Sequence, residues 1–307
     1  MLIADKVTKN YKTGKNALKS FTLSIPTKGI FALIGRNGAG KTTLVRILAT
    51  QLSLTSGSVN ILGIDVAKDA VKLRDIIACV PQDGNVVRWL TPRQFITSYL
   101  MWRGFTHKEA NMRTEKSLKE LKIEKYADVL SVHLSGGIRR KVLVCMVMAT
   151  DAKIIFLDEP STGLDPISRE ELWEVLIKLK KDHFIFLTTH YLEEAERLAN
   201  KIGIIEDGKL MALGTMDELV EKIKYPYSIK ILSDGIARKP KIGILIKGMD
   251  GHYQIMTTEK EAKMISKNLI DRGVKFSMNP LTLDDIFYYI VKKPIGTDNY
   301  ENKEEHY

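Results

Sequence analysis

The sequence predicts an α/β fold with a mainly parallel central sheet, to which antiparallel edge strands are added. Short apolar runs of the kind that a strand buried on both faces requires lie at residues 29–34, 154–157 and 184–188. Segments with helical character lie between these runs. Near the amino terminus, residues 20–25 alternate between polar and apolar side chains, which is typical of a half-buried edge strand.

The composition is that of an ordinary globular protein, with 44% hydrophobic and 27% charged residues in a chain of 307. This length favours two domains. We expect neither a signal peptide nor a membrane span, because the longest apolar run, residues 142–149, is far shorter than the ~20 residues that cross a bilayer. The two cysteines lie outside any Cys/His cluster, which disfavours a disulfide framework or a zinc site. A net charge of +10 favours an anionic partner such as a nucleotide, a nucleic acid or a membrane surface.

A glycine-rich segment, residues 35–43, lies between the apolar run at 29–34 and a helical segment. Its glycines allow backbone N–H groups to surround a phosphate, while Lys41 supplies a positive charge and Thr42 a hydroxyl for Mg²⁺. A lysine at a helix start is repelled by the helix dipole, so its position indicates a bound anion. The residues predicted to bind ATP here are Gly35, Arg36, Asn37, Gly38, Ala39, Gly40, Lys41, Thr42 and Thr43.

Two carboxylates, Asp158 and Glu159, follow one of the apolar runs. Ligands of open α/β sheets gather at the carboxyl ends of the strands, and side chains alternate in direction along a strand, so the two acids should have different roles. We predict that Asp158 holds Mg²⁺ and that Glu159 orients or deprotonates the attacking water. Gln82 and His190 follow two further predicted strands. We expect Gln82 to serve both the metal ion and catalysis, and His190 to sense the phosphate.

A second helix start, residues 134–141, places two glycines and then three cations before an apolar helix. Ser135 would make an ordinary N-cap, but capping does not account for the cations, which the helix dipole repels. A docked anion would account for them. Ser135, Gly136 and Gly137 are therefore predicted to bind a second phosphate.

Two residues have a structural as well as a functional interpretation. Tyr11 lies in a polar turn between the first two predicted strands, where it could stack on adenine or cover the sheet edge. Asp165 precedes Pro166 at a predicted helix start, where capping alone would explain it.

Taken in order, these segments resemble the ATP-binding subunit of an ABC transporter over roughly residues 1–222. The resemblance implies a P-loop NTPase core with an inserted helical subdomain. In that family two subunits meet head to tail, and each ATP lies between the Walker A loop of one subunit and the signature of the other. The motifs that carry the resemblance are the Walker A loop at 35–42, Gln82, the signature Leu134-Ser135-Gly136-Gly137, the Walker B end Asp158-Glu159, Asp165 and His190.

For individual residues, the resemblance implies that the signature binds the ATP held by Lys41 of a second copy. It further implies that Tyr11 stacks on adenine, that His190 steadies the γ-phosphate and that Asp165 has a functional role. Ile138 replaces the usual signature glutamine, and an apolar residue followed by basic ones resembles the drug-resistance and sodium-extrusion branch of exporters. Residues 280–287 resemble the C-terminal helix of the same branch.

The predicted organisation is an ATPase domain at residues 1–224, with a helical subdomain at about 90–151, and a small α+β accessory domain at 225–307. A capping box at 215–218 starts a short helix before the boundary. In the accessory domain we expect strands at 228–232, 241–246 and 253–256, helices at 259–272 and 281–291, and a polar tail at 292–307.

We therefore expect an ATPase that hydrolyses ATP with Mg²⁺. From the resemblance, we expect it to act as a dimer of identical cassettes and to drive a separate membrane permease for export. It is expected as a peripheral protein at the cytoplasmic face of the cell membrane, with no nucleic acid partner. The permease is expected to dock near Gln82 and residues 85–90, although packing between subdomains would explain the apolar side chains there equally well.

Two other functions fit the sequence less well. A soluble ABC ATPase that acts on ribosomes or DNA would be expected to carry two cassettes or a long coiled coil, and neither pattern is seen in the sequence. A nucleotide-gated scaffold without turnover is disfavoured by the intact Glu159 and His190.

Overall fold

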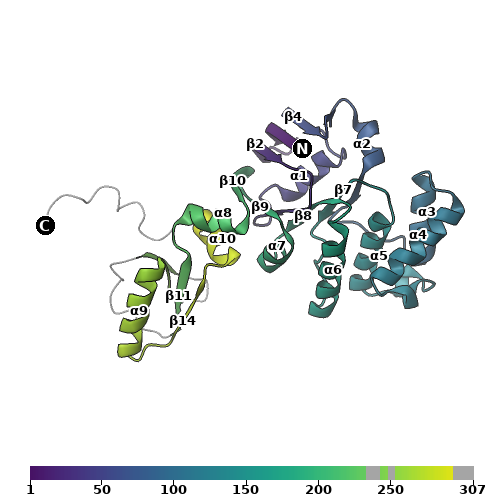
Figure 1. The fold of residues 1–307 in the computed structure, drawn as a ribbon. Coiled ribbons are helices and arrows are strands. Elements are labelled where there is room, and N and C mark those ends of the chain that lie inside the picture. Colours follow the sequence, from purple (N-terminus) through teal and green to yellow (C-terminus); the bar gives the residue numbers. More distant parts are fainter. Residues whose placement is uncertain (233–242, 248–252, 293–307) are drawn as a thin grey trace. The chain divides into compact units, whose positions relative to one another are not determined.

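The computed structural model describes residues 1–232, 243–247 and 253–292 (Figure 1). The chain divides into two compact units, Met1–Met211 and Ala212–Tyr307. This division falls before the predicted boundary at 224/225. Helix α8 (Met216–Ile223) therefore groups with the second unit, where it contacts α10 (Leu283–Lys292).

A six-stranded sheet forms the centre of the first unit, with the strand order β10-β9-β3-β8-β7-β6. The five strands from β9 to β6 are parallel, which confirms the predicted mainly parallel sheet. Every residue of β3, β7 and β8 is buried, as their apolar sequences predicted. The strands are β3 (Ile30–Ile34), β6 (Ile77–Val80), β7 (Ile154–Asp158), β8 (Phe184–Thr189), β9 (Lys201–Glu206) and β10 (Lys209–Gly214).

A second sheet of the first unit is antiparallel and has the order β2-β1-β4-β5. The alternation at residues 20–25 is confirmed, because Phe21, Leu23 and Ile25 are buried while Thr22 and Ser24 are exposed. This sheet consists of β1 (Leu2–Asn10), β2 (Asn16–Ile25), β4 (Ser56–Ile61) and β5 (Ile64–Asp65).

Helices α3, α4 and α5 form a group of their own between β6 and β7 in the sequence (Figure 1). Both α3 and α4 contact α5, whose residues from Arg140 to Met148 are all buried. These helices fall within the predicted helical subdomain at about 90–151. The helices of the first unit are α1 (Lys41–Leu48), α2 (Ala70–Ile76), α3 (Pro92–Trp102), α4 (His107–Glu120), α5 (Gly136–Met148), α6 (Pro166–Leu179) and α7 (Leu192–Leu198).

The second unit contains an antiparallel sheet with the order β12-β13-β11-β14. Strand β14 was not predicted, because Ser277, Asn279 and Pro280 are poor strand formers. The segment forms a strand in the structure because it pairs with β11. The capping box of α8 is confirmed at Thr215 and Glu218. The elements are β11 (Tyr227–Ile231), β12 (Ile244–Lys247), β13 (Tyr253–Thr257), β14 (Phe276–Pro280), α9 (Glu259–Asp271) and α10.

Two predictions for the second unit fall partly or wholly outside the described residues. The predicted strand at 241–246 includes residues 241–242, and the predicted polar tail includes 293–307; neither stretch is described. Within the part of the chain that the structure does describe, no helix has both the length and the apolar character needed to cross a membrane.

Candidate active site

The loop between β3 and α1 encloses a small polar cavity. Gly40, the N-cap residue of α1, has φ +112°, and a Cβ atom there would lie 2.6 Å from the carbonyl oxygen of Ala17, so only glycine fits. No side chain caps this helix start, which leaves its N–H groups directed toward the loop. The cavity has a volume of about 170 Å³ and is lined by Lys15, Ala17, Asn37, Gly38, Gly40, Lys41, Thr42, Thr43, Gln82 and Glu159.

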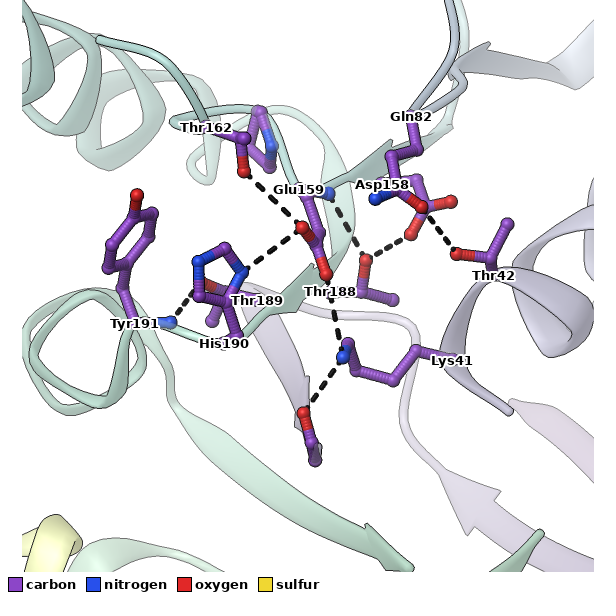
Figure 2. A network of polar contacts seen from close by, with 12 residues as sticks. Lys41, Thr42, Gln82, Asp158, Glu159, Thr162, Thr188, Thr189, His190 and Tyr191 are labelled. Carbon is purple, nitrogen blue, oxygen red and sulfur yellow. Dashed lines mark hydrogen bonds and ion pairs between the residues drawn. The ribbon is translucent and has the colours of Figure 1, made fainter. Parts of the chain in front are cut away.

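Lys41 is the buried cation of this cavity. Only 5% of the residue is exposed, and its Nζ donates to the carbonyl oxygens of Gly35 at 2.8 Å and Arg36 at 3.2 Å. The same Nζ lies 3.4 Å from Oε1 of Glu159 (Figure 2). The predicted phosphate-binding lysine and the predicted catalytic carboxylate therefore form an ion pair inside one site.

The carboxylate of Glu159 lies between Lys41 and His190. Its Oε2 accepts hydrogen bonds from the Thr162 hydroxyl at 3.3 Å and lies 3.0 Å from Nδ1 of His190 (Figure 2). The backbone of Glu159 has φ +52°, a left-handed conformation that is unfavourable for a residue with a side chain. Its N–H is held by the carbonyl oxygen of Thr188 at 3.0 Å. Strain maintained by surrounding bonds is characteristic of functional sites.

Asp158 is 1% exposed at the end of β7. The Thr188 hydroxyl donates to its Oδ1, whereas its Oδ2 has no hydrogen-bond partner among the described residues. Burial raises the pKa of Asp158, and the nearby Thr188 and Thr42 hydroxyls oppose this shift.

The surroundings of Asp158 fit a hard cation. Thr42 donates its hydroxyl to Oε1 of Gln82 at 3.1 Å, so a hydroxyl and an amide oxygen lie together at the cavity. Together with the unpartnered carboxylate oxygen of Asp158 they provide the all-oxygen ligands that Mg²⁺ prefers. The three predicted metal ligands are thus suited to that ion.

Tyr11 lies beside the loop but does not line the cavity. Its hydroxyl is 3.2 Å from the hydroxyl of Thr43, and Nζ of Lys9 lies 5.5 Å from the centre of its ring. This geometry places Tyr11 next to the predicted ATP-binding residues, and stacking on adenine stays a prediction.

The second predicted phosphate site lies apart from the cavity. Ser135 caps α5 by accepting a hydrogen bond from the N–H of Ile138 at 3.3 Å, and neither Ser135 nor the two glycines that follow line the cavity. Asp165 caps α6 in the same way, through the N–H of Ser168 at 3.0 Å, and these N–H contacts lower the pKa of Asp165. The geometry therefore agrees with the structural interpretation of Ser135 and of Asp165 as helix N-caps.

Two of the three cations at the start of α5 have partners within the protein, so the prediction that a docked anion accounts for all three was wrong for these two. Arg140 and Lys141 are buried and bind groups of the protein itself: Arg140 donates to backbone carbonyls, and Lys141 lies 2.6 Å from Oε2 of Glu171. These protein partners, not an anion, compensate both charges. The residues around the start of α5 do not indicate these partners, because the partners lie in other segments of the chain.

Three residues of the site were missed by sequence reasoning. Lys15 lines the cavity, Thr188 contacts both neighbouring carboxyl residues, and Arg140 contacts the backbone behind them. A signal for Thr188 existed, because it is the polar residue that ends the run at 184–188, and this strand pairs with the strand of Asp158. Lys15 lies in the same polar turn as Tyr11, but nothing in the sequence directed it toward the phosphate loop.

Comparisons with known proteins relate the chain to one family. Residues 18–162 match the family described as ABC transporter. ABC transporter A family member 7 of Dictyostelium discoideum is 36% identical over 217 residues, which are 71% of this chain and 26% of that protein. ABC transporter A family member 3 of Arabidopsis thaliana is 33% identical over 225 residues, or 71% of this chain and 24% of the relative. The chain thus spans about a quarter of the length of these curated relatives.

Solved structures agree with the sequence relatives. An ATP-binding cassette, described as the dimeric structure of a post-hydrolysis state bound to ADP and Pi, superposes with a TM-score of 0.66 and 26% identity. The match covers 70% of this chain and 99% of that one. A structure described as the ATP-binding subunit of an ABC transporter matches with the same TM-score and 27% identity over 73% of this chain and 93% of that one.

Proposed function

The chain belongs to the ABC transporter family through its ATP-binding domain, and on this premise we propose that it binds ATP with Mg²⁺, hydrolyses it to ADP and phosphate, and thereby drives a separate membrane permease. The observation that supports this most strongly is that Lys41 and Glu159 line one cavity and form an ion pair there, while Asp158 is buried next to Glu159 at the end of β7. Each brings a different capability: phosphate binding, metal binding and activation of water.

The contacts of Lys41 and Glu159 suggest how the site changes when ATP enters. A phosphate group in the loop would replace Glu159 as the partner of Lys41, because the N–H groups at the start of α1 and the Lys41 charge both favour an anion there. The carboxylate of Glu159 would then be free to accept a proton from water, while His190 remains within reach of its other oxygen. Mg²⁺, held by Asp158, Thr42 and Gln82, would neutralise charge that develops on the phosphates.

We propose that the active form contains two copies of this cassette with Ser135, Gly136 and Gly137 facing the ATP of the other copy. Ser135 and Gly136 are exposed, and a Cβ atom at Gly136 would meet nothing within 4 Å. The fold of one chain therefore gives no reason for glycine at this position, whereas a close partner would. A solved relative described as dimeric supports the presence of two copies.

The permease is proposed to contact the segment after Gln82. Trp89 is 76% exposed there, but Val86 is buried in the core, so only part of the predicted apolar surface is available. Peripheral association with the cytoplasmic face of the membrane, and export rather than import, follow from this proposal and from the resemblance to exporters. Substituting Trp89→Ala should weaken association with the permease in native membranes, and unchanged association would place docking elsewhere.

The decisive experiment for hydrolysis is the substitution Glu159→Gln. The variant should still bind ATP, since the loop and Lys41 are intact, but phosphate release should fall by about 100-fold or more because the general base is lost. With ATP it should accumulate as a dimer in size-exclusion chromatography, because turnover no longer separates the two copies.

The matched control is Glu174→Gln, which removes an exposed carboxylate on α6. This control should release phosphate at the wild-type rate. Wild-type turnover by Glu159→Gln would remove Glu159 from its proposed role, and a wild-type chain that binds ATP without releasing phosphate would instead indicate a nucleotide-gated scaffold.

A further inference from the structure

Arg140, in the second turn of α5, is buried against the backbone behind the candidate active site. Only 8% of the residue is exposed. Its side chain donates hydrogen bonds to carbonyl oxygens in two loops, one after β6 and one after β7. The five acceptors and their distances are Pro81 at 3.1 Å, Gln82 at 3.3 Å, Asp158 at 2.6 Å, Glu159 at 2.7 Å and Pro160 at 3.2 Å.

These contacts use the complete hydrogen-bonding capacity of the guanidinium. An arginine carries five N–H donors in a rigid planar fork. In Arg140 the single Nε donor faces Pro160, the two donors of Nη1 face the loop after β6, and the two donors of Nη2 face Asp158 and Glu159. No other side chain has this number of donors in this geometry.

The two loops joined by Arg140 carry the groups that act on phosphate. Strands β6 and β7 are parallel neighbours, and the loops continue from their carboxyl ends. One loop supplies Gln82, and the other supplies Asp158 and Glu159. Arg140 contacts the backbone of all three residues and thereby links the loop of Gln82 to the loop of the two carboxylates.

Electrostatics make this arrangement difficult to relax. A buried guanidinium is costly unless polar groups surround it. Burial lowers the pKa of Arg140, and the negative charges of Asp158 and Glu159 oppose that shift. If either loop moved away, N–H donors of Arg140 would lose their carbonyl acceptors and remain buried without hydrogen bonds. The loops and α5 are therefore held as one unit.

We propose that Arg140 is a positioning residue for ATP hydrolysis, which fixes the Gln82 backbone relative to the Asp158 and Glu159 backbones and ties both to the helix that begins at Ser135. The inference rests on the proposed ATPase function. It also gives α5 a double role: its first residues are proposed to meet the ATP of a second copy, while Arg140 holds the hydrolytic groups of its own copy.

The test compares Arg140→Gln and Arg140→Lys with the wild-type chain in steady-state phosphate release. For Arg140→Gln, kcat should fall by about 10-fold to 100-fold, since displacements on the order of 1 Å have such effects on catalysis. Arg140→Lys keeps the charge but has only three donors, so its kcat should be intermediate. The dissociation constant of a fluorescent ATP analogue should stay within about 3-fold of wild type, because the acceptors of Arg140 all lie outside residues 35–43. Arg140 contacts only the backbone carbonyl of Glu159, whereas Lys41 meets the side chain of Glu159.

A second measurement separates positioning from a general loss of stability. At saturating ATP, the Mg²⁺ concentration for half-maximal rate should rise several-fold in both Arg140 variants, because Gln82 and Asp158 are the residues whose spacing changes. The matched control is Arg103→Gln. Arg103 also donates to backbone carbonyls, those of Ile77 at 2.9 Å and Asp75 at 3.3 Å, but at the opposite end of β6. Its loss should lower the melting temperature without changing kcat or the Mg²⁺ requirement.

The outcomes distinguish this inference from the proposed function. If the wild-type chain hydrolyses ATP and Arg140→Lys matches it in both kcat and Mg²⁺ requirement, the positioning role is overturned and the ATPase stands. The role is also overturned if Arg103→Gln and Arg140→Gln lose activity equally and in proportion to their melting temperatures. A wild-type chain that releases no phosphate overturns the proposed function itself.

Discussion

Helices α1 and α5 begin with similar residues but use their cations in different ways. Both starts combine glycines with positive side chains where the helix dipole repels them. At α1, Lys41 lines the cavity and pairs with a carboxylate that a phosphate could replace. At α5, Arg140 is enclosed by backbone carbonyls and Lys141 pairs with Glu171. The same local pattern therefore places a cation in a candidate phosphate-binding cavity at α1, whereas at α5 Arg140 and Lys141 have partners within the protein.

The difference shows what the dipole argument can establish. A cation at a helix start indicates that something must compensate its charge, but not whether the compensating group is a ligand or another part of the protein. The caps also differ, because Ser135 satisfies one N–H of α5 whereas no side chain caps α1. An uncapped start beside a cavity is the better indication of an anion site.

The largest effect is expected from Lys41→Ala. Removing this charge should weaken binding of a fluorescent ATP analogue by about 100-fold or more, since charge-assisted contacts to phosphate are lost in a buried site. The fold should survive, because Glu159 keeps its contacts with Thr162 and His190. Normal nucleotide binding by a folded Lys41→Ala protein would mean that the cation at the start of α1 does not bind phosphate.

Lys141→Met is expected to lose stability but not nucleotide binding, which is the opposite of Lys41→Ala. The substitution keeps the apolar stem of the side chain but removes its charge. Loss of the buried contact with Glu171 should reduce the free energy of unfolding by about 1–3 kcal/mol. Urea denaturation measures this loss, and Lys122 near Glu171 limits it. Binding of the ATP analogue by one chain should not change. A stable variant with impaired binding would mean that α5 contributes to the site through this lysine.

A smaller effect on stability is expected from Gly136→Ala. The site is open, and alanine favours a helix over glycine, so the free energy of unfolding should stay level or rise by up to about 1 kcal/mol. ATP-dependent dimerisation, followed by light scattering, should weaken, because the extra methyl group would face the second copy. If the variant dimerises and releases phosphate like the wild type, the start of α5 is not part of the proposed dimer interface.

The smallest effect concerns a buried carboxylate away from both helix starts. Glu194 is fully buried, accepts a hydrogen bond from the Trp173 indole at 2.9 Å, and has its pKa raised by burial, which the nearby Arg169 partly opposes. An acid with a raised pKa favours folding while it is protonated. Its contribution is complete below the unfolded pKa near 4.5 and declines as pH rises toward the higher folded value.

Glu194→Gln should therefore gain stability relative to wild type as the pH increases above about 4.5, because the amide keeps an acceptor for Trp173 and carries no charge. Melting temperatures of both proteins across a pH series would show a widening difference. A difference in melting temperature that does not change with pH would contradict this prediction. It would mean that Glu194 is ionised in the folded protein and that neighbouring groups of the protein compensate its charge.

Much of the first unit could be predicted because its signals are local. Apolar runs such as 154–157 identify buried strands, and the glycines of residues 35–43 identify the loop between a strand and a helix. In the second unit, by contrast, Phe276–Pro280 has weak strand preference and becomes β14 only by pairing with β11. The two compact units divide at 211/212, and the predicted domain boundary lies at 224/225. Helix α8 lies between these two positions, and its contact with α10 joins segments that are distant in the sequence.

The sequence alone determined the identities and order of the groups at the candidate site: a predicted phosphate-binding loop, a pair of carboxylates, a glutamine and a histidine, each at or after the end of a strand. Only the tertiary structure decided the partners of their charges. Lys41 meets Glu159, and Arg140 meets a carbonyl 59 residues before it, because the parallel strands bring their carboxyl ends together. Such pairings depend on distances through space, which no local pattern of residues encodes.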